Sequence, residues 1–238
     1  MLEYFDKAYC INLTSREDRL QRVQNEFMEK GLSEFFERFP AVNLRKHDIA
    51  SEYDKAIGPY HVVPNAGCLA SHREIVKKAN NEGLKNVLVF EDDVRFISER
   101  EDFLLSIEDL KQQNWGLFYL GATIEEKMKA VTSHLFQTSF AKATHAVAYN
   151  HTVYEDILRL VPEEPEELLK FISKYTAVDN FLIKEIQSKH NTFICNPMAA
   201  VQGRSFSDIV QMNIDYSHDQ MRLFKENTPE AFFMENHK

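Results

Sequence analysis

Short apolar runs alternate with amphipathic stretches along the chain, and the two patterns predict strands and helices respectively. The runs at residues 8–11 and 86–90 are continuously apolar, which is typical of strands covered on both faces. Further strands are expected at residues 35–42, 117–120, 131–137, 145–149 and 192–195. Helices are expected between Ser15 and Gly31 and at residues 68–80, 101–112, 153–160, 166–174, 178–189 and 218–225. This alternation, with no clear linker, favours one α/β domain over residues 1–238, with a mixed C-terminal tail from about residue 205.

The first helix carries its own boundary signals. Ser15, with Asp18 three residues later, fits a capping box. Apolar side chains at helical spacing over residues 20–28 predict a buried stripe that includes Met28. Gly31 then favours the end of the helix. A strand, a loop and a helix thus open the chain, and ligands of open α/β sheets gather at the carboxyl ends of such strands.

The amino-acid composition and net charge limit the classes of ligand that the chain is expected to bind. Glycine is scarce, with 7 residues, and neither GxGxxG nor GxxxxGK[ST] occurs, so a glycine-rich phosphate loop is not expected. The 28 basic and 37 acidic residues give a formal charge of −9, which argues against nucleic acid as a partner. A small anionic ligand is compatible with this charge, because a divalent cation can supply positive charge locally.

The three cysteines, Cys10, Cys68 and Cys195, are far apart in the sequence, and two of them lie in apolar runs. This favours reduced, buried cysteines and a reducing compartment. The first residues lack the charged and apolar regions of a signal peptide, and no run approaches the ~18 apolar residues of a membrane span. We therefore expect a cytoplasmic protein.

The strongest chemical signal is the acidic triplet Glu91, Asp92 and Asp93, which follows the apolar run at residues 86–90. Three adjacent carboxylates repel one another, and a divalent cation, which prefers oxygen ligands, would remove this cost. On an extended backbone, Glu91 and Asp93 would point to one side and Asp92 to the other. The alternative is a solvated acidic turn.

A second group of candidates ends the first strand and opens the first helix. Backbone N–H groups at Asn12 and Leu13 are placed to face an anion, and Arg16 or Arg19 is long enough to reach a phosphate. The alternative is that both arginines lie on a solvated helix face.

Three further polar residues lie on predicted helices. His72 shares a face with apolar residues, so it is either a hydrogen-bonded core residue or a ligand, and Ser71 is a second polar contact beside it. Asp179 also shares an apolar helix face, where a helix N-terminus would keep it ionised, as a general base must be. The alternative for Asp179 is a simple N-cap.

The polar turn at residues 202–208 carries an arginine and Asp208. It is a candidate for a further metal ligand or a phosphate clamp, or else a surface loop. His218 is a weaker candidate for the same role.

These segments occur in a familiar order, and the chain resembles glycosyltransferase family 25. That family groups bacterial lipooligosaccharide galactosyltransferases with collagen β-galactosyltransferases. The matching segments are residues 11–19, 36–42, 67–72, 87–94, 120–121, 144–149, 178–182 and 207–209. Each motif alone is moderately specific, whereas the ordered set, from about residue 7 to about residue 210, is much more so.

The resemblance implies a Rossmann-like glycosyltransferase A-type fold, with a mixed central sheet flanked by helices. It also implies a UDP-sugar donor, commonly UDP-galactose, with Mn²⁺ or Mg²⁺ at the diphosphate, and inversion at the anomeric carbon. The acceptor is expected to be a glycan or glycolipid, as in lipooligosaccharide biosynthesis, which would allow peripheral association with the inner face of a membrane.

We predict a catalytic base, a donor site and a metal site among these candidates. The base is Asp179, the metal ligands are Asp93 and Asp208, and the donor site comprises Asn12, Leu13, Arg16, Ser71, His72, Glu91 and Asp92. Two departures from the family pattern stand out. The acidic triplet replaces a literal Asp-x-Asp, and Asn43 stands where family members often have acidic and glycine residues.

Two other classes of function remain open. A metal-dependent phosphohydrolase would also use the acidic triplet, although such sites usually gather more carboxylates and histidines around two metals. A non-catalytic module that binds a nucleotide sugar would keep the same fold without turnover.

Overall fold

A computed structural model describes residues 4–34, 36–53, 56–57, 60–207 and 209–229. Its described part is built around an eight-stranded sheet. In spatial order the strands are β2 (Phe36–Pro40), β1 (Lys7–Asn12), β5 (Asn86–Glu91), β12 (Ala146–Asn150), β7 (Leu117–Tyr119), β13 (Thr192–Cys195), β10 (Leu135–Thr138) and β9 (Lys129–Ala130).

The sheet is mixed. Strand β1 pairs parallel with β2 and β5, and β13 pairs parallel with β7. Strand β12 runs antiparallel to both β5 and β7, and β10 runs antiparallel to β13 and β9. The predicted α/β class with a mixed central sheet flanked by helices is therefore confirmed.

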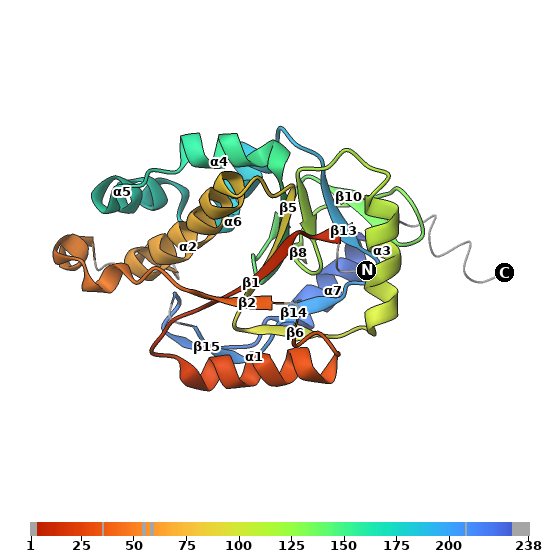
Figure 1. The fold of residues 1–238 in the computed structure, drawn as a ribbon, viewed down its shortest axis with the longest axis horizontal. Helices are drawn as coiled ribbons and strands as arrows, with labels where there is room; N and C mark the ends of the chain where they lie inside the picture. Colours follow the sequence, from red (N-terminus) through yellow and green to blue (C-terminus); the bar gives the residue numbers. More distant parts are fainter. Residues whose placement is uncertain (1–3, 35, 54–55, 58–59, 208, 230–238) are drawn as a thin grey trace.

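Helices cover both faces of this sheet. They are α1 (Glu17–Glu29), α2 (Val62–Asn81), α3 (Arg100–Leu110), α4 (Tyr154–Leu160), α5 (Pro165–Tyr175), α6 (Val178–Phe181) and α7 (Ser217–Asn227). Figure 1 shows α1 on one side of the sheet and α2 with α4 on the other. A π-helical segment, Leu182–Gln187, continues α6, and 3₁₀ turns occupy Leu44–Lys46, Asp48–Tyr53 and His151–Val153.

Short strand pairs attach to the sheet's margins. They are β6 (Val94–Phe96) with β14 (Ala200–Gln202), β8 (Thr123–Ile124) with β11 (Ala141–Lys142), β15 (Ser205–Ser207) with β16 (Met212–Ile214), and β3 (Ala56–Ile57) with β4 (Tyr60–His61). The described part of the C-terminal tail contains β15, β16 and α7.

The core lies on both faces of the sheet because side chains alternate along each buried strand. In β5, Val87 and Val89 pack with the side chains of α2 and α4, whereas Leu88 and Phe90 pack with those of α1 and α3. This double cover explains why the strand reads as one continuous apolar run in the sequence. It also fixes the direction of the next residue, Glu91, which follows Val89 on the α2 face.

The structure corrects two expectations about α1. No side chain caps its first turn, and its N-cap residue is Arg16, so the capping box at Ser15 is wrong. Met28 is 62% exposed and lies outside the buried stripe, which ends at Phe27. Gly31 adopts a φ of 65° just after the helix, as its position predicted.

Helix α2 begins six residues earlier than expected and contains Gly67 in its interior. A Cβ at that glycine would lie 2.6 Å from the carbonyl oxygen of Val42. Gly67 therefore permits the close approach of α2 to the segment after β2. The strand expected at residues 131–137 is also different, because the chain forms two short strands, β9 and β10, around a turn.

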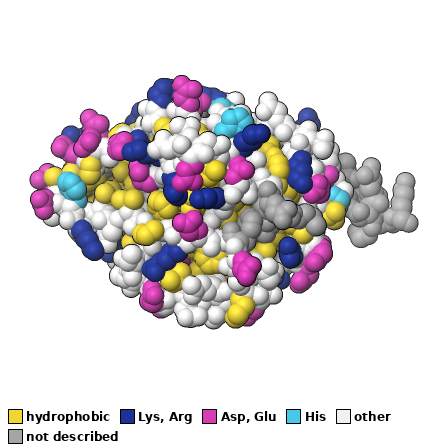
Figure 2. Space-filling model, viewed as in Figure 1, with side chains coloured by type: hydrophobic (Ala, Val, Ile, Leu, Met, Phe, Trp, Pro, Cys, Tyr) yellow, Lys and Arg dark blue, Asp and Glu magenta, His cyan; other side chains and the backbone are white. Residues whose placement is uncertain are grey.

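Charges are mixed on the face of the molecule drawn in Figure 2, where basic side chains are interspersed with acidic ones among the described residues. Within the described ranges, no helix is both long enough and apolar enough to span a bilayer.

Candidate active site

The acidic triplet lies at the carboxyl end of β5, and its three carboxylates divide into two groups. The strand ends at Glu91, so this residue keeps the strand's alternation and faces α2. Asp92 and Asp93 belong to the turn before β6 and both pair with Arg19 on α1. The expected grouping of Glu91 with Asp93 is therefore wrong, because period-two alternation ends where the strand ends.

Glu91 is held by three neighbours. Its Oε1 accepts a hydrogen bond from Thr144 Oγ1 at 2.5 Å and lies 3.4 Å from His72 Nε2 and 3.9 Å from Cys68 Sγ. Burial raises the pKa of the Glu91 carboxyl, but the hydrogen bond and charge of His72, together with Thr144, lower it more, and the pKa falls from 4.5 to about 2. Glu91 is a carboxylate at neutral pH.

His72 combines both of the alternatives that the sequence left open. It is 3% exposed, and its Nδ1 lies 2.9 Å from the hydroxyl of Tyr149 on β12. Its Nε2 faces Glu91 in the same network. His72 is thus a hydrogen-bonded core residue that also orients a carboxylate of the site.

Asp92 is buried and fully engaged. Its Oδ2 accepts from Asn12 Nδ2 at 2.6 Å, and its Oδ1 pairs with the Arg19 guanidinium. Arg22 Nη2 donates to its carbonyl oxygen at 2.9 Å. Burial raises the pKa of Asp92 and the nearby Asp93 charge adds to it, so the pKa rises from 3.8 to about 6 although Arg19 and Asn12 oppose the change.

Asp93 is pinned between α1 and β14. Its Oδ2 pairs with Arg19 Nη2 at 3.2 Å and accepts from Gln202 Nε2 at 3.0 Å, while its carbonyl oxygen accepts from Gly203 N at 2.8 Å. The other carboxylate oxygen, Oδ1, is buried and has no hydrogen-bond partner among the described residues. A buried carboxylate oxygen left without a partner is costly, and a cation would satisfy it. The residues present therefore fit a divalent cation at Asp93.

A cavity of about 190 Å³ opens over the carboxyl ends of β1 and β5. Of the predicted donor residues, it is lined by Asn12, Leu13, Ser71, Glu91 and Asp92, and Asp93 joins them. Arg19 and Arg45 bring positive charge to the same wall.

Two predicted donor residues lie outside the lining of this cavity. Arg16 pairs with Asp18 through two hydrogen bonds of 3.0 Å, and His72 lies behind Glu91. The Ser71 hydroxyl bonds two backbone groups: it accepts a hydrogen bond from Val42 N at 2.9 Å and donates one to the Gly67 carbonyl at 2.7 Å. It thereby holds the loop after β2 in place at the cavity.

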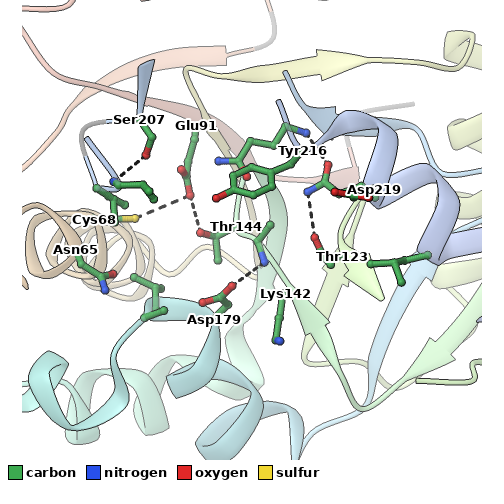
Figure 3. Close-up of a pocket in the computed structure, with 18 of the residues that line it drawn as sticks. Asn65, Cys68, Glu91, Thr123, Lys142, Thr144, Asp179, Ser207, Tyr216 and Asp219 are labelled. Atoms are coloured by element: carbon green, nitrogen blue, oxygen red, sulfur yellow. Dashed lines mark hydrogen bonds between the residues drawn. The ribbon is translucent and has the colours of Figure 1, made fainter. Parts of the chain in front are cut away.

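A second cavity, of about 360 Å³, adjoins the first. Glu91, Cys68 and Gln202 line both cavities, so they form a shared wall. Asp179 lines only the second cavity, and Figure 3 shows Thr144 between Asp179 and Glu91. The structure thus brings Asp179 and the triplet to neighbouring cavities that meet at one wall.

Asp179 is the second residue of α6 and accepts two backbone hydrogen bonds. Ala143 N donates to its Oδ2 at 3.1 Å, and Asn180 N approaches its Oδ1 at 3.2 Å. Ala143 has a φ of 69°, which turns its N–H toward the carboxylate's side of the cavity. Burial raises the pKa of Asp179 above 3.8 although both N–H groups oppose it, which makes the carboxylate a stronger base.

Other candidates have different outcomes. Asp208 lies outside the described residues. His218 is exposed on α7 and is not among the residues that line either cavity, whereas Arg204 of the polar turn is exposed and offers its carbonyl oxygen to Arg22 at 2.8 Å.

Several residues that complete the site have only weak signals in the sequence. Thr144 and Cys68 lie within segments that match the family but were assigned no role. Lys142 and Tyr216 line the second cavity and carry no motif of their own.

Comparisons with known proteins assign the chain's sequence to a family. The profile described as Glycosyltransferase family 25 (LPS biosynthesis protein) matches residues 5–156, which is more than half of the chain. The chain belongs to glycosyltransferase family 25. The match includes the triplet, its arginine partner and Thr144, and it confirms the resemblance drawn from the ordered motifs.

Curated relatives are similar at moderate identity. A glycosyltransferase 25 family member of Anopheles gambiae is 28% identical over 189 residues, covering 73% of this chain and 30% of the relative. Procollagen galactosyltransferase 2 of Mus musculus is 27% identical over 195 residues, covering 75% and 30%. An inactive glycosyltransferase 25 family member 3 of Homo sapiens is 31% identical over 129 residues, covering 49% and 22%. The chain therefore spans between 22% and 30% of the length of these relatives.

Solved structures show weaker similarity. A glycosyltransferase involved in the glycosylation of the major capsid of PBCV-1 aligns with a TM-score of 0.40 at 11% identity, covering 79% of this chain and 92% of that one. A197 from STIV aligns with a TM-score of 0.45 at 9% identity, covering 88% and 93%. The family assignment rests on the sequence match.

Proposed function

We propose that this chain is a metal-dependent glycosyltransferase that moves a sugar, galactose in the first instance, from a UDP-sugar to a hydroxyl group of a glycan or glycolipid. The observation that carries this proposal is the pair of adjoining cavities with one shared wall. The acidic triplet lines one cavity and Asp179 lines the other. A donor in the first cavity and an acceptor in the second would place their reacting atoms near that wall.

The donor side of the proposal rests on charge. The first cavity is acidic at Asp92 and Asp93 and basic at Arg19 and Arg45, so a diphosphate there needs a cation to bridge it to the carboxylates. Asp93 Oδ1 is the free ligand atom, and Mn²⁺ or Mg²⁺ commonly takes one or two carboxylates together with substrate phosphates. When bound, such a cation would stabilise the negative charge of the departing diphosphate.

The acceptor side rests on Asp179. Its carboxylate accepts the proton of the acceptor hydroxyl as that oxygen bonds to the anomeric carbon and the bond from that carbon to the diphosphate breaks. Such general-base assistance is worth on the order of 10²–10⁴ in rate. Attack from the cavity opposite the leaving group inverts the anomeric carbon. The choice of galactose follows the names of procollagen galactosyltransferases among the relatives.

The first experiment measures release of UDP from UDP-galactose with and without an acceptor glycan, in the presence of Mn²⁺, for wild type and Asp93→Ala. We expect turnover only with the acceptor, and a loss of turnover in the variant while its circular dichroism spectrum is unchanged. Undiminished activity in a folded Asp93→Ala would remove the triplet from the mechanism. Acceptor-independent cleavage would favour a phosphohydrolase.

The second experiment compares Asp179→Asn with wild type. The variant should lower turnover by about 10²-fold or more while donor affinity, measured by calorimetry with UDP and Mn²⁺, changes little. A variant that mainly loses donor affinity would contradict the base assignment. Tight UDP binding by wild type without transfer or cleavage would instead support a non-catalytic module, a reading favoured by the human relative named as inactive.

A further inference from the structure

Three side chains of different chemistry converge on the shared wall of the two cavities. They are Cys68 and His72, four residues apart on α2, and Glu91 at the end of β5. Their ligand atoms, one sulfur, one ring nitrogen and one carboxylate oxygen, all lie within 4.8 Å of one another. We propose that these residues form a second metal site, for a borderline-soft divalent cation such as Zn²⁺, separate from the hard-cation site at Asp93.

Two of the three distances between ligand atoms are close to those that a tetrahedral zinc ion imposes. Two nitrogen or oxygen ligands ~2.1 Å from zinc lie ~3.4 Å apart, and a thiolate and an oxygen ligand lie ~3.6 Å apart. His72 Nε2 and Glu91 Oε1 are 3.4 Å apart, and Cys68 Sγ and the same oxygen are 3.9 Å apart. All three ligand atoms lie within 4.8 Å of one another, so the thiol and the imidazole would approach each other by up to about 1.2 Å to reach the ~3.6 Å that zinc imposes on a sulfur and a nitrogen ligand.

The second layer of contacts orients the ligands toward one point. Tyr149 Oη lies 2.9 Å from His72 Nδ1, which leaves Nε2 directed at Glu91. Thr144 Oγ1 donates to Glu91 at 2.5 Å and fixes that carboxylate. Metal-bound histidines usually have such a partner on the other ring nitrogen, and it sets both tautomer and ring orientation.

The ligand set separates this site from Asp93 by chemistry. A thiolate and an imidazole favour zinc and related transition metals, whereas carboxylate and phosphate oxygens favour Mg²⁺ and Mn²⁺. Cys68 also lines both cavities, so a fourth position is open to water or a ligand. On binding, the Cys68 thiol would release its proton to solvent, and the metal–sulfur bond would take its place.

Cobalt(II) is the spectroscopic probe for this site, because a cobalt–thiolate bond gives a charge-transfer absorption in the near ultraviolet that oxygen and nitrogen ligands do not. We expect one equivalent of Co²⁺ to produce this band in the full chain, and Zn²⁺ to abolish it by competition. Cys68→Ser should remove the band and weaken Zn²⁺ binding, measured against a chromophoric chelator, by at least ~10-fold.

Three matched variants make the test specific. Tyr149→Phe keeps all three ligands but loses the hydrogen bond to His72, and should weaken Zn²⁺ binding by ~10–100-fold. Asp93→Ala should retain the cobalt band even if it ends transfer, so failure of the proposed function leaves this test intact. His218→Gln, at an exposed histidine of α7, should change neither quantity. Equal Zn²⁺ affinity in wild type and Cys68→Ser, or a cobalt spectrum without the band, would overturn the proposal.

Discussion

The carboxyl of Asp92 has a pKa raised from 3.8 to about 6, first because it is buried and then because Asp93 is close by. The folded state therefore binds the Asp92 proton more tightly than the unfolded state. The contribution of protonated Asp92 to the free energy of unfolding is fully present below about pH 4. It is lost as the pH rises through about 6. At ~1.36 kcal/mol for each pKa unit, the change between about pH 4 and pH 7.5 is roughly 2–3 kcal/mol.

Asp92→Asn isolates this effect because the amide keeps the side chain's shape and cannot ionise. We expect the free energy of unfolding of wild type, relative to that of the variant, to rise by roughly 2–3 kcal/mol as the pH falls from about 7.5 to about 4. Urea unfolding measures it at both pH values, in a chelating buffer so that no cation occupies the triplet. Trp115 is the chain's single tryptophan and is 3% exposed, so its fluorescence reports unfolding.

The control is Asp18→Asn. Asp18 is exposed and its pKa is lowered, chiefly by a hydrogen bond from Arg16, so any pH effect of that substitution should be small and of opposite sign. If the stability difference between wild type and Asp92→Asn does not change with pH, burial does not govern the ionisation of Asp92. Arg19 and Asn12 would then offset the cost of burying the charge completely, and the raised pKa of Asp92 would be refuted.

Two further predictions concern backbone and loop packing. Gly121→Ala should lower the free energy of unfolding, measured by urea titration, by more than about 3 kcal/mol, because the new Cβ would lie 1.7 Å from the Ala200 carbonyl oxygen. Gly83→Ala is the control: its new Cβ meets open space at a φ of 69°, and the substitution should cost only about 1–2 kcal/mol. Ser71→Ala leaves the N–H of Val42 unpaired and should cost about 1–3 kcal/mol. It should also weaken UDP binding in calorimetry, whereas unchanged affinity would show that the loop after β2 does not contact the donor.

Much of the fold was predictable because it depends on neighbouring residues. Continuous apolar runs located β1, β5, β7, β12 and β13 to within one or two residues. Predictions failed where a boundary depended on tertiary contacts. Helix α2 extends back to Val62 because its first turn packs into the core on the α2 face of the sheet. The local sequence pattern does not predict this contact.

The site shows the same division. The triplet's place at the end of a buried strand was evident from the sequence, and so was the candidacy of Asp179. The orientation of the triplet was not, because alternation predicts side-chain direction only while the strand continues. The hydrogen-bond partners of the triplet could not be predicted from the sequence, since Asn12 lies 80 residues from Asp92 and Gln202 lies 109 residues from Asp93.

The sequence by itself determined most strands of the central sheet, most of the helices and an acidic group at one strand's end, since hydrophobic periodicity is a property of adjacent residues. Only the tertiary structure decided that Arg19 would bridge two of those acids while the third would face Cys68 and His72. Such contacts follow from the order of strands in the sheet and from the helices packed on each face. Many residues must be folded together before that order exists.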